Sequence, residues 1–434
     1  MMNDVFYGSA EGGWIYPLIN GNVVLPVKMG VLLSATGAFL IYHSRRCIDQ
    51  FPTLVIAMWL LVATAGQATI RTLAPFPDRD AVSMGSNGFY RDAGAYPPTK
   101  FLRDFREIAP HLHFHVRANL AGKVLFYHLL RGITDSPADI AWLILGVSNL
   151  GALLAYAIVR ELFNDRFAGL AALILYLFLP SKIFFFPLLN TVSPVFILLP
   201  LWLLVRYLAT RKPTWLVAMG VSLYALVLFE PLPLITGLTF VALIGRAWGL
   251  HTIDWKNVVA LIAVVPLGFF VTNLVVAQAF GYEIVSAFEF AYHDAKEFNV
   301  RQNRPYDVWL VANPIETLSN TGLFTSAIVF GIAGVGMFQM SRVMWAKGWR
   351  SAWAVACEPE LCLAMSALAS LAVVDSMGIN RGETVRLWIF LGVFLQLPVA
   401  RLCARRPVLL IGVLTGSIMQ ACVGLGSRGF VLPG

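Results

Sequence analysis

The sequence predicts an all-α polytopic membrane protein with about twelve transmembrane helices and a long first extracytoplasmic loop that carries juxtamembrane helices. Hydrophobic residues make up 58% of the chain and charged residues 13%, whereas a soluble domain has about 25% charged residues. Apolar runs long enough to cross a bilayer, about 18 residues or more, recur to the end of the chain. A polar, charge-rich stretch from Ala74 to Gly132 interrupts them and predicts the loop.

The apolar runs divide the chain into five regions. Residues 1–70 hold two N-terminal spans, 71–137 form the first extracytoplasmic loop, 138–280 hold spans three to eight, 281–320 form a second extracytoplasmic loop, and 321–434 hold spans nine to twelve. The individual spans are predicted at residues 24–43, 52–70, 138–159, 167–184, 190–206, 214–230, 232–248, 257–279, 321–341, 355–375, 385–402 and 407–425.

Clustered cations mark every second short connection between the predicted spans. Cytoplasmic loops of membrane proteins are enriched in Lys and Arg, so these connections are predicted to face the cytoplasm and both termini to face outward. The connections carry Arg45, Arg46, Arg160, Arg166, Arg206, Arg211, Lys212, Arg246, Lys256, Arg342, Lys347, Arg350, Arg401, Arg405 and Arg406. We attribute the net charge of +8 to these loop cations, which orient the spans and contact anionic membrane lipids. We therefore expect no nucleic-acid partner.

Two segments of the first loop have the pattern of helices that lie on a membrane surface. Lys123–Arg131 is apolar but far too short to cross a bilayer. Thr99–Ile108 places Phe101, Leu102 and Phe105 on one face and cations around the other, as in an interfacial helix. We expect both segments to be juxtamembrane helices.

The polar residues of the outer side gather in the first loop, in the second loop and before the eleventh span. Arg386 and Glu383 stand at the mouth of an apolar helix, where ionisable groups are costly unless they are paired or line an aqueous cavity. Arginines such as Arg381 and Arg386 can bind a phosphate through two hydrogen bonds. Alternatively, Arg381, Glu383 and Arg386 form a structural ion-pair network, and a loop carboxylate is simply solvated.

Histidines of the first loop do not indicate a metal site. His111, His113 and His115 alternate and could share one face of a strand, but no further ligand set is evident. We expect no cofactor; a divalent metal stays an alternative, which no paired acidic motif supports.

Three segments resemble motifs of the GT-C class of membrane glycosyltransferases. His115–Tyr127 (HVRANLAGKVLFY) resembles the first-loop motif H-x-R-x-H-P-P-G-x-V-L-F-Y, and Arg160–Arg166 (RELFNDR), with the apolar run that leads to Pro180, resembles a run R-x-L-F-G-x-R. Asn380–Phe390 (NRGETVRLWIF) resembles a G-E-x-x-R-x-W-x-F segment of a bacterial branch. The resemblance covers roughly residues 70–400.

The chain departs from the first-loop motif at two places. Asn119 stands where the motif has His, and Leu120 and Ala121 stand where it has Pro-Pro. An amide can donate and accept hydrogen bonds but cannot titrate. We therefore expect Asn119 to bind substrate and not to act as an acid or base.

The resemblance implies that the protein transfers a sugar, with inversion, from a polyprenyl-phosphate donor to a glycan, lipid or protein acceptor on the extracytoplasmic face, and the tail motif favours the bacterial inner (plasma) membrane. The class uses an acidic residue of the first outer loop as general base, and Asp92, Asp80 and Asp78 compete for this role. The residues predicted to bind substrate are His115, Arg117, Asn119, Lys123, His293, Arg304, Tyr306, Trp309, Arg381, Glu383 and Arg386.

Two other functions fit parts of the sequence. A transporter or flippase of a lipid-linked or anionic substrate would explain the outer cations, but it usually has internal repeats or interrupted helices at matched positions, and neither is evident. A membrane acyltransferase with a histidine base would make His115 or His128 central.

Overall fold

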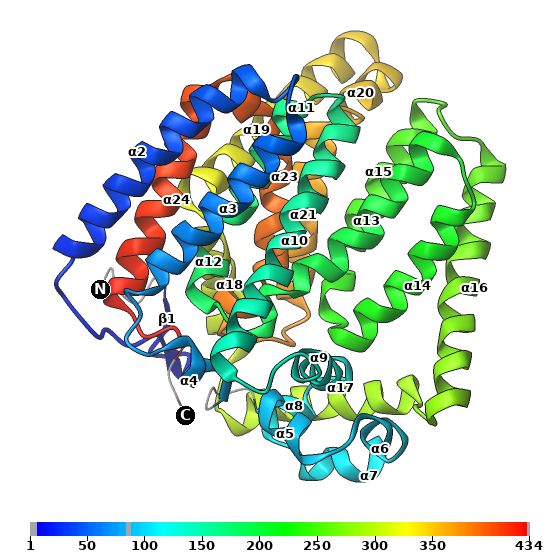
Figure 1. The fold of residues 1–434 in the computed structure, drawn as a ribbon. Helices are drawn as coiled ribbons and strands as arrows, with labels where there is room; N and C mark the ends of the chain where they lie inside the picture. The colour runs from blue at the N-terminus through cyan, green and yellow to red at the C-terminus, as the bar shows by residue number, and fades with distance from the viewer. Residues whose placement is uncertain (1–6, 84–87, 432–434) are drawn as a thin grey trace.

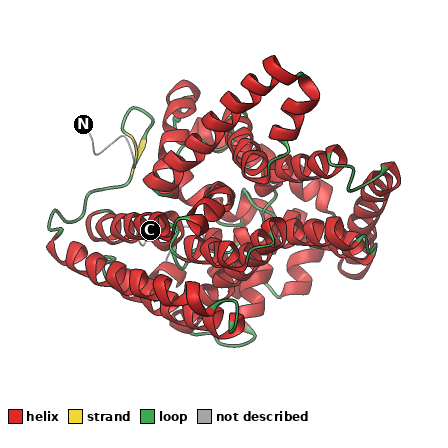
Figure 2. Cartoon of the chain, turned by 90° about the horizontal axis from the view of Figure 1, so that it is seen from above, coloured by secondary structure: helices red, strands yellow, loops and turns green. Residues whose placement is uncertain are grey.

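The computed structural model describes residues 7–83 and 88–431. Within these residues the chain is almost entirely helical, and its strands are confined to one small hairpin of β1 (Gly8–Ser9) and β2 (Trp14–Ile15). Long helices form a bundle, and short helices gather below one of its ends (Figure 1). Seen from above, the hairpin lies at the edge of the bundle (Figure 2).

Two long helices, α2 (Val24–Cys47) and α3 (Pro52–Arg71), precede the first polar segment. The described part of that segment consists of α4 (Asp78–Ser83), α5 (Phe89–Ala95), α6 (Pro98–Arg103), α7 (Phe105–Ile108), η1 (Ala109–His111), α8 (Phe114–Arg117) and α9 (Gly122–Arg131). Thr99–Ile108 is helical as α6 and α7, and Lys123–Arg131 is helical within α9. That these helices lie on a membrane surface stays a prediction. The three histidines do not share the face of a strand, because they lie in or beside η1 and α8.

The rest of the chain is helical from Pro137 onward. The middle region comprises α10 (Pro137–Phe163), α11 (Arg166–Leu177), α12 (Pro180–Phe185), η2 (Leu189–Thr191), α13 (Ser193–Thr210), α14 (Thr214–Phe229), η3 (Leu232–Thr236), α15 (Gly237–Gly249) and α16 (Trp255–Phe280). The last region comprises α17 (Ile284–Arg301), α18 (Tyr306–Thr321), α19 (Leu323–Lys347), α20 (Trp349–Ala356), α21 (Pro359–Ser376), α22 (Thr384–Leu387), α23 (Ile389–Arg405) and α24 (Pro407–Ser427). The expected second loop, 281–320, therefore consists mostly of α17 and α18.

Nine helices among the described residues are long and apolar enough to cross a membrane, which identifies an integral membrane protein. The other predicted spans fall on the shorter helices α11, α14 and α23, so the count of twelve spans stays a prediction. The single helix predicted over 167–184 is wrong, since α11 ends at Leu177 and α12 begins at Pro180. Proline disfavours the helical conformation of the residue before it, and Leu179 is extended, with φ −61° and ψ 117°.

Capping residues in the sequence define several helix ends. The Ser136 hydroxyl accepts a backbone N–H of the first turn of α10, and the Asp165 carboxylate does the same for α11. Asp254 and Asn257 form a reciprocal capping box at the start of α16. Gly281, with φ 71°, ends α16 in the left-handed conformation that favours glycine.

Successive long helices run in alternate directions, so the connections sort to two ends of the bundle (Figure 1). The cation-rich connections, such as those after α2, α10 and α13, lie at the upper end of this view. The helices α4–α9 and α17 lie at the lower end. Both ends of the described chain lie there too, joined by a hydrogen bond of 2.9 Å from Gly429 N to Pro17 O. This separation agrees with the alternation that the cations predict.

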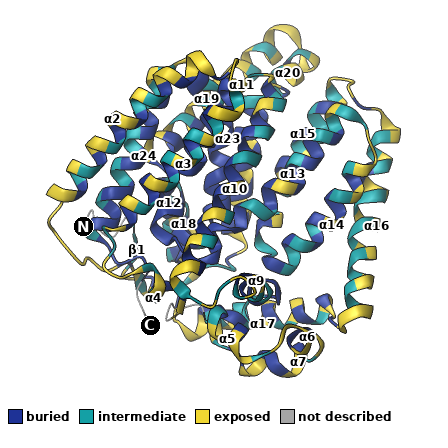
Figure 3. Cartoon of the chain, viewed as in Figure 1, coloured by how far each residue is buried: buried dark blue, intermediate teal, exposed yellow. Residues whose placement is uncertain are grey.

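Buried apolar side chains form two clusters. The larger one surrounds the central helices α11 and α23, whereas α2 and α16 expose much of their surface (Figure 3). The second joins the short helices to the bundle through side chains such as Phe101, Phe105 and Tyr127, packed with Ile144 and Tyr224. Because this second cluster anchors α5–α9, the short helices hold defined positions against the end of the bundle.

Candidate functional site

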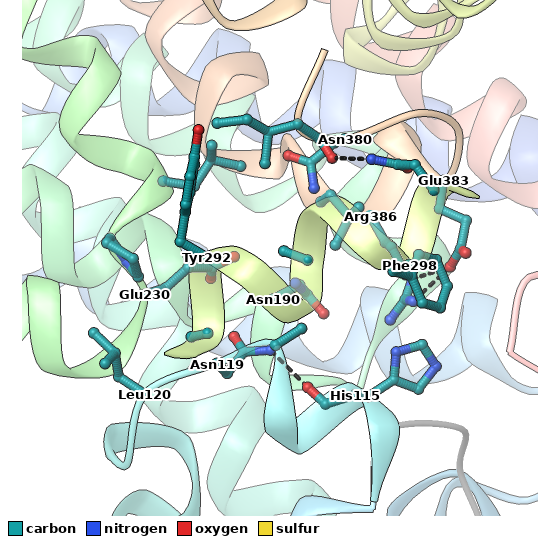
Figure 4. Close-up of a pocket in the computed structure, with 18 of the residues that line it drawn as sticks. His115, Asn119, Leu120, Asn190, Glu230, Tyr292, Phe298, Asn380, Glu383 and Arg386 are labelled. Atoms are coloured by element: carbon teal, nitrogen blue, oxygen red, sulfur yellow. Dashed lines mark hydrogen bonds and ion pairs between the residues drawn. The ribbon is translucent and has the colours of Figure 1, made fainter. Parts of the chain in front are cut away.

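A cavity of about 460 Å³ lies where the short helices meet the lower end of the bundle. Its walls come from α5, α8 and α9, from η2, from the turn between α14 and η3, from α17, and from the segment 377–387. Aromatic and apolar side chains cover much of the surface, and polar groups project from several sides (Figure 4). Such a mostly apolar cavity with a few placed polar groups is typical of a ligand site.

Positive charge exceeds negative charge on the cavity wall. Four cations and two carboxylates line it: Lys123, Arg304, Arg381, Arg386, Glu230 and Glu383. The excess of two positive charges favours an anionic ligand.

Glu383 is held between two arginines. Arg304 Nη2 donates to Glu383 Oε1 at 2.6 Å, and Arg386 Nε donates to Oε2 at 2.8 Å. Burial raises the pKa of Glu383, but the two guanidinium charges outweigh this effect and hold the pKa at about 2. Glu383 is therefore a permanent anion that positions two arginines. The ion-pair network considered from the sequence exists, but Arg304 takes part in place of Arg381.

Backbone geometry makes the turn before α22 possible. Gly382 has φ 82° and Glu383 has φ 60°, both in the left-handed region. A Cβ at Gly382 would lie 2.8 Å from the Trp309 ring, so the glycine also permits close packing. Asn313 holds the turn from α18, because its Oδ1 accepts Gly382 N at 3.0 Å and its Nδ2 donates to Asn380 O at 2.9 Å.

A second buried carboxylate supports the same turn. Glu316 Oε2 accepts the backbone N–H of Thr384 at 2.7 Å and that of Val385 at 3.3 Å. Burial raises the pKa of Glu316 to about 7, although these hydrogen bonds favour its charged form. The position of Glu383 and Arg386 thus depends on a group that changes charge near neutral pH.

Arg381 differs from its arginine neighbours. Its Nη1 donates to Arg304 O at 2.9 Å, its Nε donates to Gly378 O at 3.2 Å, and its guanidinium lies 5.4 Å from the centre of the Tyr306 ring. Arg381 forms no ion pair with a carboxylate among the residues that the structure describes. Its charge is therefore available to a ligand in the cavity.

Lys123 and Glu230 form a second charged group on the wall. Lys123 Nζ lies 3.2 Å from Glu230 Oε2 and donates to Asn119 Oδ1 at 3.1 Å. The Ser193 hydroxyl donates to the same Oε2. Burial lowers the pKa of Lys123, and the Glu230 carboxylate opposes this shift.

His115 contributes a neutral imidazole. Burial, together with the nearby charge of Arg386, lowers the pKa of His115 to about 3. Asn119 Nδ2 donates to the His115 carbonyl at 2.7 Å, which fixes the first-loop motif residues relative to each other. His115 is therefore suited to hydrogen bonding and carries no charge at neutral pH.

The cavity brings together most of the residues predicted to bind substrate. Those that line it are His115, Asn119, Lys123, Arg304, Arg381, Glu383 and Arg386. The remaining four do not line it: Arg117 pairs with Asp294, His293 is exposed on α17, Tyr306 donates its hydroxyl to Ser376 O at 2.8 Å, and the fully buried Trp309 donates to Gly12 O at 3.0 Å.

The three aspartates predicted as catalytic lie away from the cavity wall. Asp92 is 5% exposed on α5, where its Oδ2 accepts His113 N at 3.2 Å and its Oδ1 lies 3.3 Å from Arg91 Nε. Asp78 pairs with Arg71 at 2.6 Å, and Asp80 lies 3.5 Å from Arg79. Their catalytic role stays a prediction, and it is not supported by their position because none of them lines the cavity.

Three polar residues of the cavity were not predicted from the sequence. Glu230, Asn190 and Asn299 line it. Glu230 did carry a signal, because an ionisable residue at the end of an apolar helix marks a functional position in a membrane protein. Asn190 and Asn299 carried none, since nothing in their local sequence separates them from structural amides.

No group of three His, Cys, Asp or Glu side chains within residues 7–83 and 88–431 is arranged to hold a metal ion. Comparison with known proteins adds no family: no protein-family model matches the chain, and no protein of curated function matches it significantly.

Proposed function

We propose that this protein is a membrane glycosyltransferase that transfers a sugar, with inversion, from a polyprenyl-phosphate donor to an acceptor on the extracytoplasmic face. One observation supports this most directly. Residues of the first-loop motif, His115, Asn119 and Lys123, and of the tail motif, Arg381 and Arg386, line one cavity although they are far apart in sequence. Two motifs that resemble the same class thus converge on one site.

The chemistry of the wall fits the donor. Arg381 and Arg386 bind the phosphate, since a guanidinium can donate two parallel hydrogen bonds to its oxygens. Leu234, Phe288 and Tyr292 line the cavity and are also well exposed, so they offer apolar surface to the isoprenoid chain. When the sugar leaves, the same arginines stabilise the negative charge that develops on the phosphate.

The distribution of cations supports the orientation. Helices that line the cavity, such as α5, α8, α9 and α17, lie at the end of the bundle opposite the cation-rich connections (Figure 1). Because those connections favour the cytoplasm, the cavity faces outward. The resemblance of residues 380–390 to a bacterial branch favours the bacterial inner membrane.

The proposal is tested by incubating the protein, in membranes of the cells that express it, with polyprenyl phosphates that carry a radiolabelled hexose or pentose. We expect one donor to be consumed and free polyprenyl phosphate to be formed. Arg381→Ala should reduce consumption strongly, whereas Arg106→Ala, at an exposed position on α7, should not. If every donor stays intact with the wild-type protein, the proposal fails.

A transporter or flippase of a lipid-linked or anionic substrate is the second candidate. The interruption between α11 and α12 at Pro180 favours it, because transporters build sites at broken helices. A transporter would bind the same phosphate lipid in the cavity but leave the sugar–phosphate bond intact. The labelled donor therefore distinguishes the two functions.

A further inference from the structure

We propose that Glu230 is the general base of this reaction and that Glu230 and Asn190 form the subsite for the acceptor hydroxyl. The inference rests on the function proposed above and concerns the same cavity. It replaces the expectation that a carboxylate of the first loop performs this step.

Glu230 has one anchored oxygen and one free oxygen. Lys123 Nζ, at 3.2 Å, and the Ser193 hydroxyl both contact Oε2. Within the described part of the chain, Oε1 accepts no hydrogen bond, and the residue lines the cavity. A general base needs this arrangement, because the anchored oxygen fixes the carboxylate while the other accepts a proton.

The other carboxylates near the cavity lack this combination. Among the described residues, Glu316 Oε1 and Asp294 Oδ2 also accept no hydrogen bond, but neither residue lines the cavity. Both oxygens of Glu383 are bound by arginines. Asp92 lies behind the wall, and its two oxygens contact His113 N and Arg91. Glu230 thus combines access to the cavity with an oxygen that is not engaged.

The positions of the two charged groups suit an inverting reaction. Figure 4 shows Glu230 on the side of the cavity opposite the Glu383–Arg386 pair, with Asn119 and Asn190 between them in this view. If the arginines hold the phosphate, an acceptor beside Glu230 approaches the sugar from the face opposite the leaving group. Inverting enzymes place their base on that face.

The step is chemically balanced. Glu230 Oε1 takes the proton of the acceptor hydroxyl, and the acceptor oxygen forms a bond to the anomeric carbon. The bond from that carbon to the phosphate oxygen breaks, and its electron pair leaves with the polyprenyl phosphate, whose charge Arg381 and Arg386 stabilise. The proton on Glu230 then passes to solvent.

Asn190, beside Glu230, makes the subsite suitable for a neutral acceptor with a hydroxyl group. It is 7% exposed, lines the cavity, and makes no side-chain hydrogen bond among the described residues. Its amide can both donate to and accept from a hydroxyl. A carboxylate beside it repels anions, so we expect the acceptor to be a neutral molecule with a hydroxyl group, such as a sugar or polyol.

Glu230→Gln tests the inference in the donor-consumption assay described above, with the membranes supplying the acceptor. Gln keeps the shape and hydrogen bonding of Glu but cannot take a proton. We expect transfer to fall about 10²-fold or more, the usual contribution of a general base, while the affinity for the labelled donor changes less than about twofold. Glu297→Gln, at an exposed carboxylate on α17, is the control and should retain full activity.

The outcomes separate the inference from the proposed function. If the wild-type protein consumes a donor and Glu230→Gln does so equally fast, Glu230 is not the base but the glycosyltransferase stands. If Glu230→Gln loses donor binding along with transfer, the carboxylate is merely structural and the inference fails. Asn190→Ala provides a second measurement, in which donor consumption should fall while the affinity for the labelled donor is unchanged; unchanged consumption contradicts the acceptor subsite.

Discussion

Two glutamates on the wall of one cavity have opposite surroundings. Glu383 is enclosed by Arg304 and Arg386, which engage both of its oxygens. Glu230 is anchored through one oxygen by Lys123 and Ser193. Under the proposed function, Glu383 positions the arginines that bind the phosphate, and Glu230 accepts the proton of the acceptor. Both residues are buried, so they differ in the number of engaged oxygens, which is two in Glu383 and one in Glu230.

The largest expected effect is on stability, in Glu383→Gln. Removing the negative charge leaves two buried guanidinium groups without a counter-charge, and breaking a buried ion pair costs about 3–5 kcal/mol. Glu230→Gln should cost less, since it leaves one ammonium uncompensated. Thermal unfolding in detergent measures both, with Glu297→Gln as the exposed control. An equal loss of stability in Glu383→Gln and Glu230→Gln would contradict the distinction between the two glutamates.

The pH dependence of stability separates Glu383 from Glu316. The low pKa of Glu383, about 2, means that its contribution is complete above its ordinary pKa of 4.5 and is lost as the pH falls from 4.5 through 2. The raised pKa of Glu316, about 7, means that the folded protein binds this proton more tightly, so stability falls as the pH rises from 4.5 to 7.

Glu316→Gln should therefore remove the decline in unfolding temperature between pH 4.5 and 7. Gln retains an oxygen that can accept the N–H groups of Thr384 and Val385, so the turn should keep its shape. Unfolding curves at several pH values check this. A decline of the same size in the variant would place its cause elsewhere.

A smaller effect, on binding alone, is expected at Arg381. Hydrogen bonds to charged groups contribute about 1.5–3 kcal/mol, so Arg381→Ala should weaken donor binding by roughly 10- to 100-fold. Because Arg381 has no carboxylate partner in the described chain, unfolding should change little. Arg381→Lys keeps the charge but loses the paired hydrogen bonds of the guanidinium. Its donor affinity should therefore lie between those of the wild-type protein and Arg381→Ala. Equilibrium binding of labelled donor measures the series.

The smallest effect is expected at His115. Its pKa of about 3 leaves the imidazole neutral from pH 5 to 8. Donor binding in His115→Gln should therefore show the same pH dependence as in the wild-type protein over this range. A pH-dependent step that disappears in the variant would show that His115 titrates near neutrality, and would favour a histidine-based mechanism.

Much of the architecture follows from the sequence because its causes are local. Hydropathy over one helix length identifies the membrane-length helices, and the clustered cations sort the connections to two ends. Pro180 is a local signal for the break between α11 and α12. The apolar run on both sides of it nevertheless led to the prediction of a single span over 167–184. The sequence predicted an extracytoplasmic loop over 281–320 but no helices within it, whereas α17 and α18 occupy most of this segment.

Less of the site follows from the sequence. Motif residues such as His115, Lys123 and Arg386 were identified because they stand in recognisable spacing, and they do line the cavity. Trp309 was predicted to bind substrate, but its ring is buried against Gly12 and does not line the cavity. The loop aspartates were plausible by position in the chain, yet packing turned Asp92 away from the cavity wall.

The sequence by itself determined that this is a helical membrane protein with a basic end and an opposite polar end, because hydrophobicity and charge act through composition along each segment. Only the tertiary structure decided which polar groups share a cavity, which oxygens are engaged, and that Glu230 faces the cavity while Asp92 does not. Those outcomes depend on packing between segments far apart in the chain, and local spacing carries no record of it.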